Sequence, residues 1–237
     1  MNTRRRAMLI SIMLAGGAAL AVPAPSAQAA TTDPCADTGN GKLRYSTGTA
    51  RHLVFAVSPG YSSNKVVVTE CVKAGDSWEK VSVTSGRAGR NGFAEPGEKR
   101  EGDGKSPTGS YVLSEAFGVR DPGTGLPYRR LSGSGDCWGS TSGKSDYNQY
   151  YSGTCRSTDE DLSQIMRQGA YRQAVVIDYN RPEAVDGHGS AIFLHVGGVM
   201  PTAGCISIEK PKLRAIMRTL VKGDRIIMGP RAALFRS

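Results

Sequence analysis

The sequence predicts a mainly β protein that folds as a single domain with two short α-helices. Short runs rich in β-branched or alternating apolar residues recur along the chain, and clusters rich in Gly, Pro and Ser separate them. Apolar residues at helical spacing occur in only two segments. The 237 residues are enough for one domain with a hydrophobic core.

The first 29 residues have the pattern of a secretory signal peptide. Three arginines at positions 4–6 precede an apolar stretch over 7–22, and Ala27-Gln28-Ala29 provides a cleavage pattern. The alternative is a membrane anchor, but Pro23 and two glycines break the short apolar stretch. No later stretch approaches the ~18–20 apolar residues of a membrane span. We therefore expect a secreted protein of the cell wall or extracellular space, with no membrane span.

The net charge favours some partners over others. Removing residues 1–29, which carry three arginines and no acidic residue, lowers the formal net charge from +9 to +6 and leaves 208 residues. A modest positive charge suits anionic surfaces such as wall polymers and peptide carboxylates. No basic run is interleaved with aromatic residues, so nucleic acid is not an expected partner.

Strands are expected along most of the remaining chain. Residues 30–50 are polar and rich in Gly and Thr, which indicates an N-terminal tail or linker. The predicted strands cover residues 51–57, 65–72, 77–83, 111–118, 173–179, 190–196, 205–208 and 224–229. Two long loops, 85–109 and 119–157, interrupt them, and the glycine-rich first loop is a candidate lid.

Two helices complete the prediction. Thr158 is expected to cap the first, whose first turn holds the acidic residues 159–161 and which ends at Gly169. The second is expected from Pro211 to Leu220, with Pro in its first turn. Residues 230–237 are expected to form a C-terminal tail.

Five cysteines leave one unpaired after two disulfides. Cys137 and Cys155 bracket a polar loop, and a Cys35–Cys71 bond would attach the N-terminal tail to a strand. Four cysteines allow three pairings, so the sequence leaves the connectivity open. The spacing favours these two pairs and leaves Cys205 free.

The free thiol is predicted to lie near an imidazole. In the strand 190–196, His195 lies on the face opposite Leu194; in 205–208, Cys205 lies opposite Ile206. If both aliphatic faces point into the core, His195 and Cys205 share the other face. The Gly-rich connection between these strands suits a hairpin-like return.

A thiol beside an imidazole suits acyl transfer through a thioester. Gly204 would let a carbonyl carbon approach, with backbone N–H groups near Cys205 free to hold an oxyanion. The alternative is an inert buried cysteine and a core histidine. A metal site is disfavoured because His188, His195 and Cys205 lack paired-ligand spacing. We expect no metal and no cofactor.

A resemblance to a known family strengthens the catalytic interpretation. The run GSAIFLHVGGVMPTAGCIS resembles the active-site segment of the L,D-transpeptidase (YkuD-like) catalytic domain, in the branch whose cysteine motif reads TAGC rather than SHGC. EGDGKSPTGSYVLSEAFG resembles that branch's glycine-rich turn and P-x-G strand, and LPYRR, DYNQYY and VVIDYN follow in the expected order. The resemblance covers residues 51–229, which we take as the catalytic domain.

This resemblance implies a β-sandwich-like fold and an enzyme that joins peptidoglycan stem peptides. Such enzymes attack the bond after the third, meso-diaminopimelyl residue of a tetrapeptide, release D-alanine and pass the acyl group to an amine. Cys205 matches the family nucleophile, and His195 matches the general base. Gly204 matches the residue next to the oxyanion hole.

The sequence departs from the SHGC pattern at two positions. Ala203 replaces the histidine of that motif, and Ser207 replaces an Arg or Asn. Ser207 and the strand-end residues Tyr179 and Asn180 are predicted to contact substrate.

The expected partner is the peptidoglycan stem peptide, and the protein is expected to be a monomer. Two alternatives to a transpeptidase are a hydrolase (L,D-carboxypeptidase or endopeptidase) that uses the same site and a non-catalytic wall-binding protein.

Overall fold

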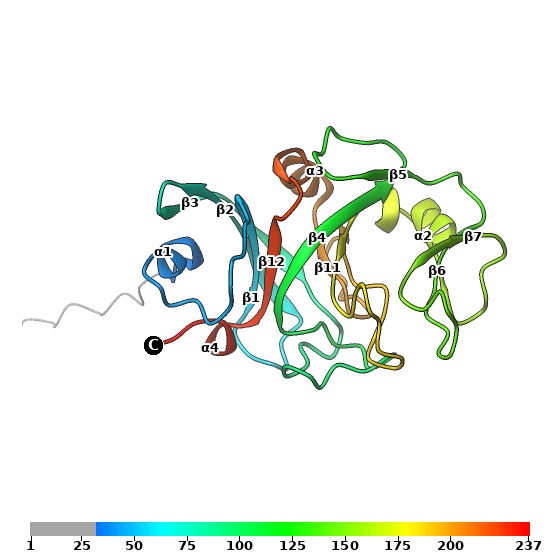
Figure 1. Ribbon diagram of the computed structural model, residues 1–237, viewed down its shortest axis with the longest axis horizontal. Coiled ribbons are helices and arrows are strands. Elements are labelled where there is room, and N and C mark those ends of the chain that lie inside the picture. The colour runs from blue at the N-terminus through cyan, green and yellow to red at the C-terminus, as the bar shows by residue number, and fades with distance from the viewer. Residues whose placement is uncertain (1–31) are drawn as a thin grey trace, which may run out of the picture. The chain divides into compact units, whose positions relative to one another are not determined.

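The computed structural model describes residues 32–237, and residues 33–237 form one unit built mainly of β-strands (Figure 1). The predicted signal peptide, residues 1–29, lies outside the described residues. Within the described part of the chain, no helix is long and apolar enough to cross a membrane.

A nine-stranded sheet forms the body of the unit. Its strands in spatial order are β12 (Arg225–Pro230), β1 (His52–Ser58), β2 (Lys65–Ala74), β3 (Ser77–Arg87), β11 (Ile206–Ile208), β10 (Phe193–Val196), β9 (Gln173–Ile177), β4 (Gly109–Gly118) and β5 (Tyr128–Arg130). β12 also pairs with β4, so the sheet closes on itself, and in Figure 1 β12 runs between β1 and β4. The closed sheet surrounds the largest hydrophobic core and places two parts of the sheet face to face, as in a sandwich.

The strand alternation expected around the candidate site is confirmed. Ile192, Leu194 and Ile206 pack in the core inside the sheet. Phe193 and Cys205 belong to a second hydrophobic cluster on the opposite face. The period-2 pattern therefore identified the two faces correctly.

The direction of pairing differs from the expected hairpin-like return. β10 and β11 are parallel, with Leu194 opposite Ile206 and His195 opposite Ser207. The connection does not turn tightly, because Thr202 pairs with the chain after β3: its N–H donates to the Ala88 carbonyl over 3.0 Å. The chain thus travels back along the sheet and enters β11 in the same direction as β10.

The predicted loop 119–157 contains strands that the sequence analysis missed. Besides β5, it holds β6 (Asp136–Trp138) and β7 (Tyr150–Ser152), which form a small sheet with β8 (Glu160–Asp161). Strands of two or three residues are too short to show alternation. The Trp138 ring packs edge-on against the Phe193 ring, with 5.0 Å between centroids, so this small sheet covers the outer face of β10.

The helices differ from prediction in number and at one boundary. The structure describes four α-helices, α1 (Pro34–Gly39), α2 (Leu162–Gln168), α3 (Lys210–Thr219) and α4 (Arg231–Leu234), and one 3₁₀ turn, η1 (Ala170–Arg172). Thr158 does not cap α2; Asp161 does, because Glu160 and Asp161 are still extended in β8. Gly169 ends α2 in the left-handed conformation (φ 110°), as predicted.

Both expected tails are packed against the sheet. α1 lies within the segment interpreted as a tail or linker, and the Cys35–Cys71 disulfide joins it to β2. Near the C-terminus, the Phe235 ring packs on Phe55 with 5.7 Å between centroids. Both segments are polar overall, and this composition gave no sign of the few residues in each that pack in a hydrophobic cluster.

Both disulfides favoured by spacing are present, and Cys205 is free. The double variant Cys137→Ala/Cys155→Ala is expected to lower the free energy of unfolding by about 3 kcal/mol, because the bond closes a loop with a sequence separation of 18. Denaturant unfolding would measure this change. Cys35→Ala/Cys71→Ala, with a separation of 36, is the matched control and should lose about 4 kcal/mol. An unchanged unfolding midpoint in the first variant would contradict the prediction.

Candidate active site

A cavity of about 550 Å³ opens on the outer face of β10. Four of the predicted site residues line it: Cys205, His195, Gly204 and Ser207. The parallel register accounts for this grouping, since Cys205 lies one residue before the Leu194–Ile206 pair and therefore beside Phe193. Phe193 and His195 share a face of β10, so thiol and imidazole lie on the same side of the sheet.

The Cys205 thiol is 6% exposed and is held by the chain at the start of β10. Its sulfur accepts a hydrogen bond from the Phe193 N–H (3.3 Å), and its proton points to the Ala191 carbonyl (3.2 Å). Burial and the negative charge of Glu160 raise the pKa of the thiol to about 12, against the opposing effect of the hydrogen bond from Phe193. The resting group is therefore a neutral thiol.

His195 is 8% exposed, and the backbone of the next residue orients its imidazole. Nδ1 lies 2.8 Å from the Val196 carbonyl oxygen. A carbonyl only accepts hydrogen bonds, so Nδ1 carries the proton and Nε2 has a free lone pair. Burial lowers the pKa of His195 to about 4, which keeps the ring neutral near pH 7. A neutral imidazole with a free Nε2 can act as a base.

The chain at Gly204 and Cys205 offers a hydrogen-bond donor for an oxyanion. The Gly204 N–H is already used by the Thr202 hydroxyl (3.1 Å). By contrast, no hydrogen bond among residues 32–237 uses the Cys205 N–H. The candidate oxyanion donor is therefore the amide of Cys205 itself, next to the glycine that the sequence singled out.

Ser207 lies opposite His195 in the parallel register. Its side chain is 1% exposed, and its hydroxyl oxygen has no hydrogen-bond partner in the described part of the chain. Ala203, which replaces the histidine of the SHGC pattern, also lines the cavity.

Tyr171 and Glu160 complete the wall beside His195, and sequence reasoning did not find them. The Tyr171 hydroxyl donates to the Glu160 carboxylate over 3.1 Å, and its ring packs edge-on against the His195 ring with 5.3 Å between centroids. Burial raises the pKa of the Glu160 carboxyl, partly offset by the Tyr171 hydroxyl. These residues come from β8 and η1, and no motif in the sequence connects them to the cysteine segment.

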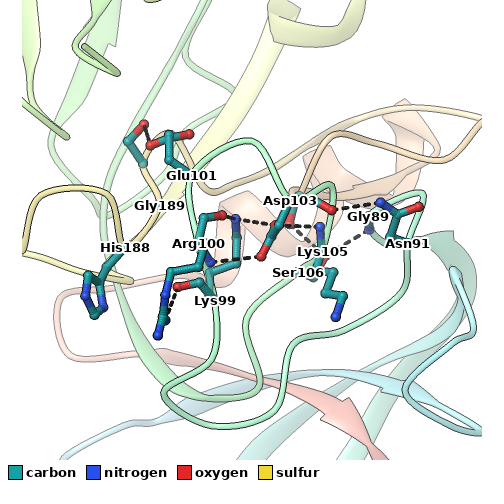
Figure 2. Close-up of polar contacts among 12 residues, drawn as sticks. Gly89, Asn91, Lys99, Arg100, Glu101, Asp103, Lys105, Ser106, His188 and Gly189 are labelled. Carbon is teal, nitrogen blue, oxygen red and sulfur yellow. Dashed lines mark hydrogen bonds and ion pairs between the residues drawn. The ribbon is translucent and has the colours of Figure 1, made fainter. Parts of the chain in front are cut away.

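The loop after β3 supplies a charged side of the cavity through Lys99 and Glu101. Lys99 is 4% exposed, and its ammonium donates to the Asp103 carboxylate (2.7 Å) and the Arg100 carbonyl (2.6 Å). Glu101 accepts hydrogen bonds from Ser190 (2.7 Å) and Tyr147 (2.6 Å). Figure 2 shows the close packing of Lys99, Arg100 and Asp103 within this loop.

Tyr179 and Asn180, the remaining predicted contact residues, are not among the residues that line the cavity. The Tyr179 hydroxyl donates to the His188 carbonyl over 2.7 Å. Asn180 has a positive φ of 54°, and its amide donates to the Val185 and Gly189 carbonyls, both over 2.9 Å. Both side chains hold the turn that precedes Ser190.

The donor set of the cavity does not suit a metal ion. Across residues 32–237, no group of three or more His, Cys, Asp or Glu side chains is arranged to hold a metal.

A comparison with models of protein families identifies the family of this chain. The family model described as the L,D-transpeptidase catalytic domain (YkuD) matches residues 62–228. No curated protein sequence matches the chain.

Two solved structures are similar to this chain, and it spans about half the length of each. The helical cell shape determining protein Pgp2 from Campylobacter jejuni is 16% identical with a TM-score of 0.43, over 83% of this chain and 53% of Pgp2. Bd1075 from Bdellovibrio bacteriovorus is 14% identical with a TM-score of 0.39, over 76% of this chain and 48% of Bd1075. Because the family model spans more than half of the sequence, this chain belongs to the L,D-transpeptidase (YkuD) catalytic domain family.

Proposed function

We propose that the protein is an exported cysteine L,D-transpeptidase that acts on peptidoglycan stem peptides through a thioester acyl-enzyme. The observation that carries this proposal is the only free cysteine of the described chain, placed in a cavity with a neutral histidine and an unused backbone amide. Membership of the family supplies the substrate class.

In the first half-reaction, the Cys205 sulfur attacks the carbonyl carbon of the third residue of a stem tetrapeptide. Nε2 of His195 takes the thiol proton, and the Cys205 N–H stabilises the oxyanion of the tetrahedral intermediate. The C–N bond then breaks, the proton passes from His195 to the departing amine, and D-alanine leaves. The product is a thioester between the peptide and Cys205.

In the second half-reaction, an acceptor amine attacks the thioester carbonyl. His195 takes a proton from the amine and returns it to the departing sulfur, which restores the neutral thiol and imidazole. The new amide bond joins two stem peptides, and no external oxidant or energy source is required.

Two features of the chain support export. The two disulfides are typical of oxidising compartments, and the positive charge of residues 30–237 suits an anionic wall.

Acylation tests the nucleophile directly. Brief exposure of the protein to a carbapenem should add one inhibitor mass, and Cys205→Ala should abolish the adduct because no other thiol is free. Intact-mass spectrometry provides the readout. If neither protein forms an adduct and Cys205 is also inert to iodoacetamide, the wall-binding alternative replaces this proposal.

The nature of the acceptor separates a transferase from a hydrolase. With a stem tetrapeptide as donor, the transpeptidase should form a crosslinked product whose yield rises with the concentration of an added amine. Product masses with and without the amine measure this. Release of tripeptide alone, at a rate independent of the amine, would identify the hydrolase.

The pH dependence should differ between acylation and alkylation. Acylation uses the neutral thiol and a histidine base, so its rate should rise through the His195 pKa of about 4 and stay flat through neutral pH. Alkylation by iodoacetamide needs the thiolate, so its rate should rise about tenfold per pH unit towards the Cys205 pKa of about 12. A plateau of alkylation near neutral pH would indicate a preformed thiolate–imidazolium pair instead.

A further inference from the structure

Ser106 connects the loop after β3 to the turn that carries Cys205. It is fully buried (0% exposed), just before β4. Its hydroxyl accepts a hydrogen bond from the Gly89 N–H over 2.9 Å and donates to the Gly204 carbonyl over 2.6 Å. The Cys205 carbonyl oxygen also lies 3.4 Å from the same hydroxyl. Ser106 therefore contacts both peptide groups that flank the nucleophile.

The bond to the Gly204 carbonyl fixes the direction of the Cys205 amide. The Gly204–Cys205 peptide group is planar, and in a trans peptide C=O and N–H point in opposite directions. A carbonyl held by Ser106 therefore turns the Cys205 N–H away from the loop. That N–H is the one near the sulfur that no group of residues 32–237 uses.

Thr202 restrains the same turn from the other side. Its hydroxyl donates to the Cys205 carbonyl over 2.6 Å and accepts from the Gly204 N–H over 3.1 Å. Its backbone pairs with the chain after β3, where the Arg90 N–H donates to the Thr202 carbonyl over 2.8 Å. With these groups occupied, rotation of the Cys205 amide would break several hydrogen bonds at once.

The two ends of the loop that presents Ser106 are packed against each other. A Cβ added at Gly89 would lie 2.4 Å from the Gly104 carbonyl oxygen, so the two ends of the loop are in direct backbone contact. The Asn91 side chain donates to the Asp103 carbonyl over 2.8 Å. Figure 2 shows Gly89, Asn91, Asp103 and Ser106 together in this arrangement. These contacts hold the two ends of the loop together next to Ser106.

We infer that Ser106 is a positioning residue for the acyl-transfer reaction: its hydroxyl sets the direction of the Cys205 N–H that stabilises the oxyanion. The inference rests on the proposed function. Because the Ser106 hydroxyl bonds to backbone groups and forms no hydrogen bond with the sulfur or the imidazole, its loss should affect the oxyanion and leave the thiol's own reactivity unchanged.

Two reactions of the same sulfur separate these effects. Acylation by a carbapenem passes through an oxyanion, whereas alkylation by iodoacetamide displaces iodide and forms none. In Ser106→Ala, the acylation rate constant should fall about 10- to 100-fold, while the alkylation rate at the same pH stays within about twofold of wild type. Both reactions are quenched at a series of times, and intact-mass spectrometry of the samples gives the two rates.

Thr108→Val is the matched control. Thr108 is also buried, and its hydroxyl donates to the Ala94 carbonyl over 2.6 Å, in the same segment but away from the cysteine turn. It should change the melting temperature without changing the ratio of acylation to alkylation. Ser106→Thr keeps the hydroxyl and should restore acylation towards wild type.

The outcomes distinguish this inference from the proposed function. If wild type is not acylated, the proposed function fails first. If wild type is acylated and folded Ser106→Ala reacts equally fast, or loses alkylation to the same extent, the positioning role is wrong. If Ser106→Ala does not fold, Thr202→Val replaces it, because the partly exposed Thr202 hydroxyl holds the two peptide groups on either side of the one that carries the Cys205 N–H. It should show the same selective loss, and an unchanged ratio would overturn the inference.

Discussion

The parallel pairing of β10 with β11 is the constraint on which the candidate site depends. It places Cys205 beside Phe193, two positions from His195 on one face of the sheet. An antiparallel pairing of the same segments would instead place the start of β11 beside the end of β10, so Cys205 would not lie beside Phe193. The direction is set by contacts of the connecting chain with the region after β3, above all the backbone bridge between Gly89 and Thr202. Residues remote in sequence therefore decide which part of β10 lies beside the thiol.

Burial keeps both reactive groups, the Cys205 thiol and the His195 imidazole, in their neutral forms. It raises the pKa of the thiol and lowers that of the imidazole, so charge separation at rest is unfavourable in both groups. Under the proposed mechanism, the proton must move as the sulfur attacks. The rate then depends on how well the base and the oxyanion donor are positioned, rather than on a stored thiolate. This gives a physical reason for the dense hydrogen bonding around Gly204 and Cys205.

The sequence predicted those features that depend on local pattern. Alternation identified the faces of His195 and Cys205, and the odd number of cysteines pointed to Cys205 as the free one. The sequence did not predict the direction of β11, because this direction depends on tertiary contacts of Thr202. The small sheet was missed because its strands are too short to show the alternation of apolar and polar residues that identifies a strand. Tyr171 and Glu160 were missed because their role comes from packing against His195 and Cys205, which no local motif encodes.

The small sheet links the Cys137–Cys155 disulfide to the chemistry. Trp138 of β6 packs on Phe193, whose N–H holds the Cys205 sulfur, and Glu160 of β8 orients the tyrosine that packs on His195. This family member lacks the histidine of the SHGC pattern, and the Ala203 side chain provides no polar atom at that position of its cavity. Two polar side chains of the same cavity, Glu160 and Tyr171, come from β8 and η1. Under the proposed function, the disulfide-bonded segment is therefore part of the reaction environment as well as of the fold, and it is where substrate selection should differ from that of SHGC relatives.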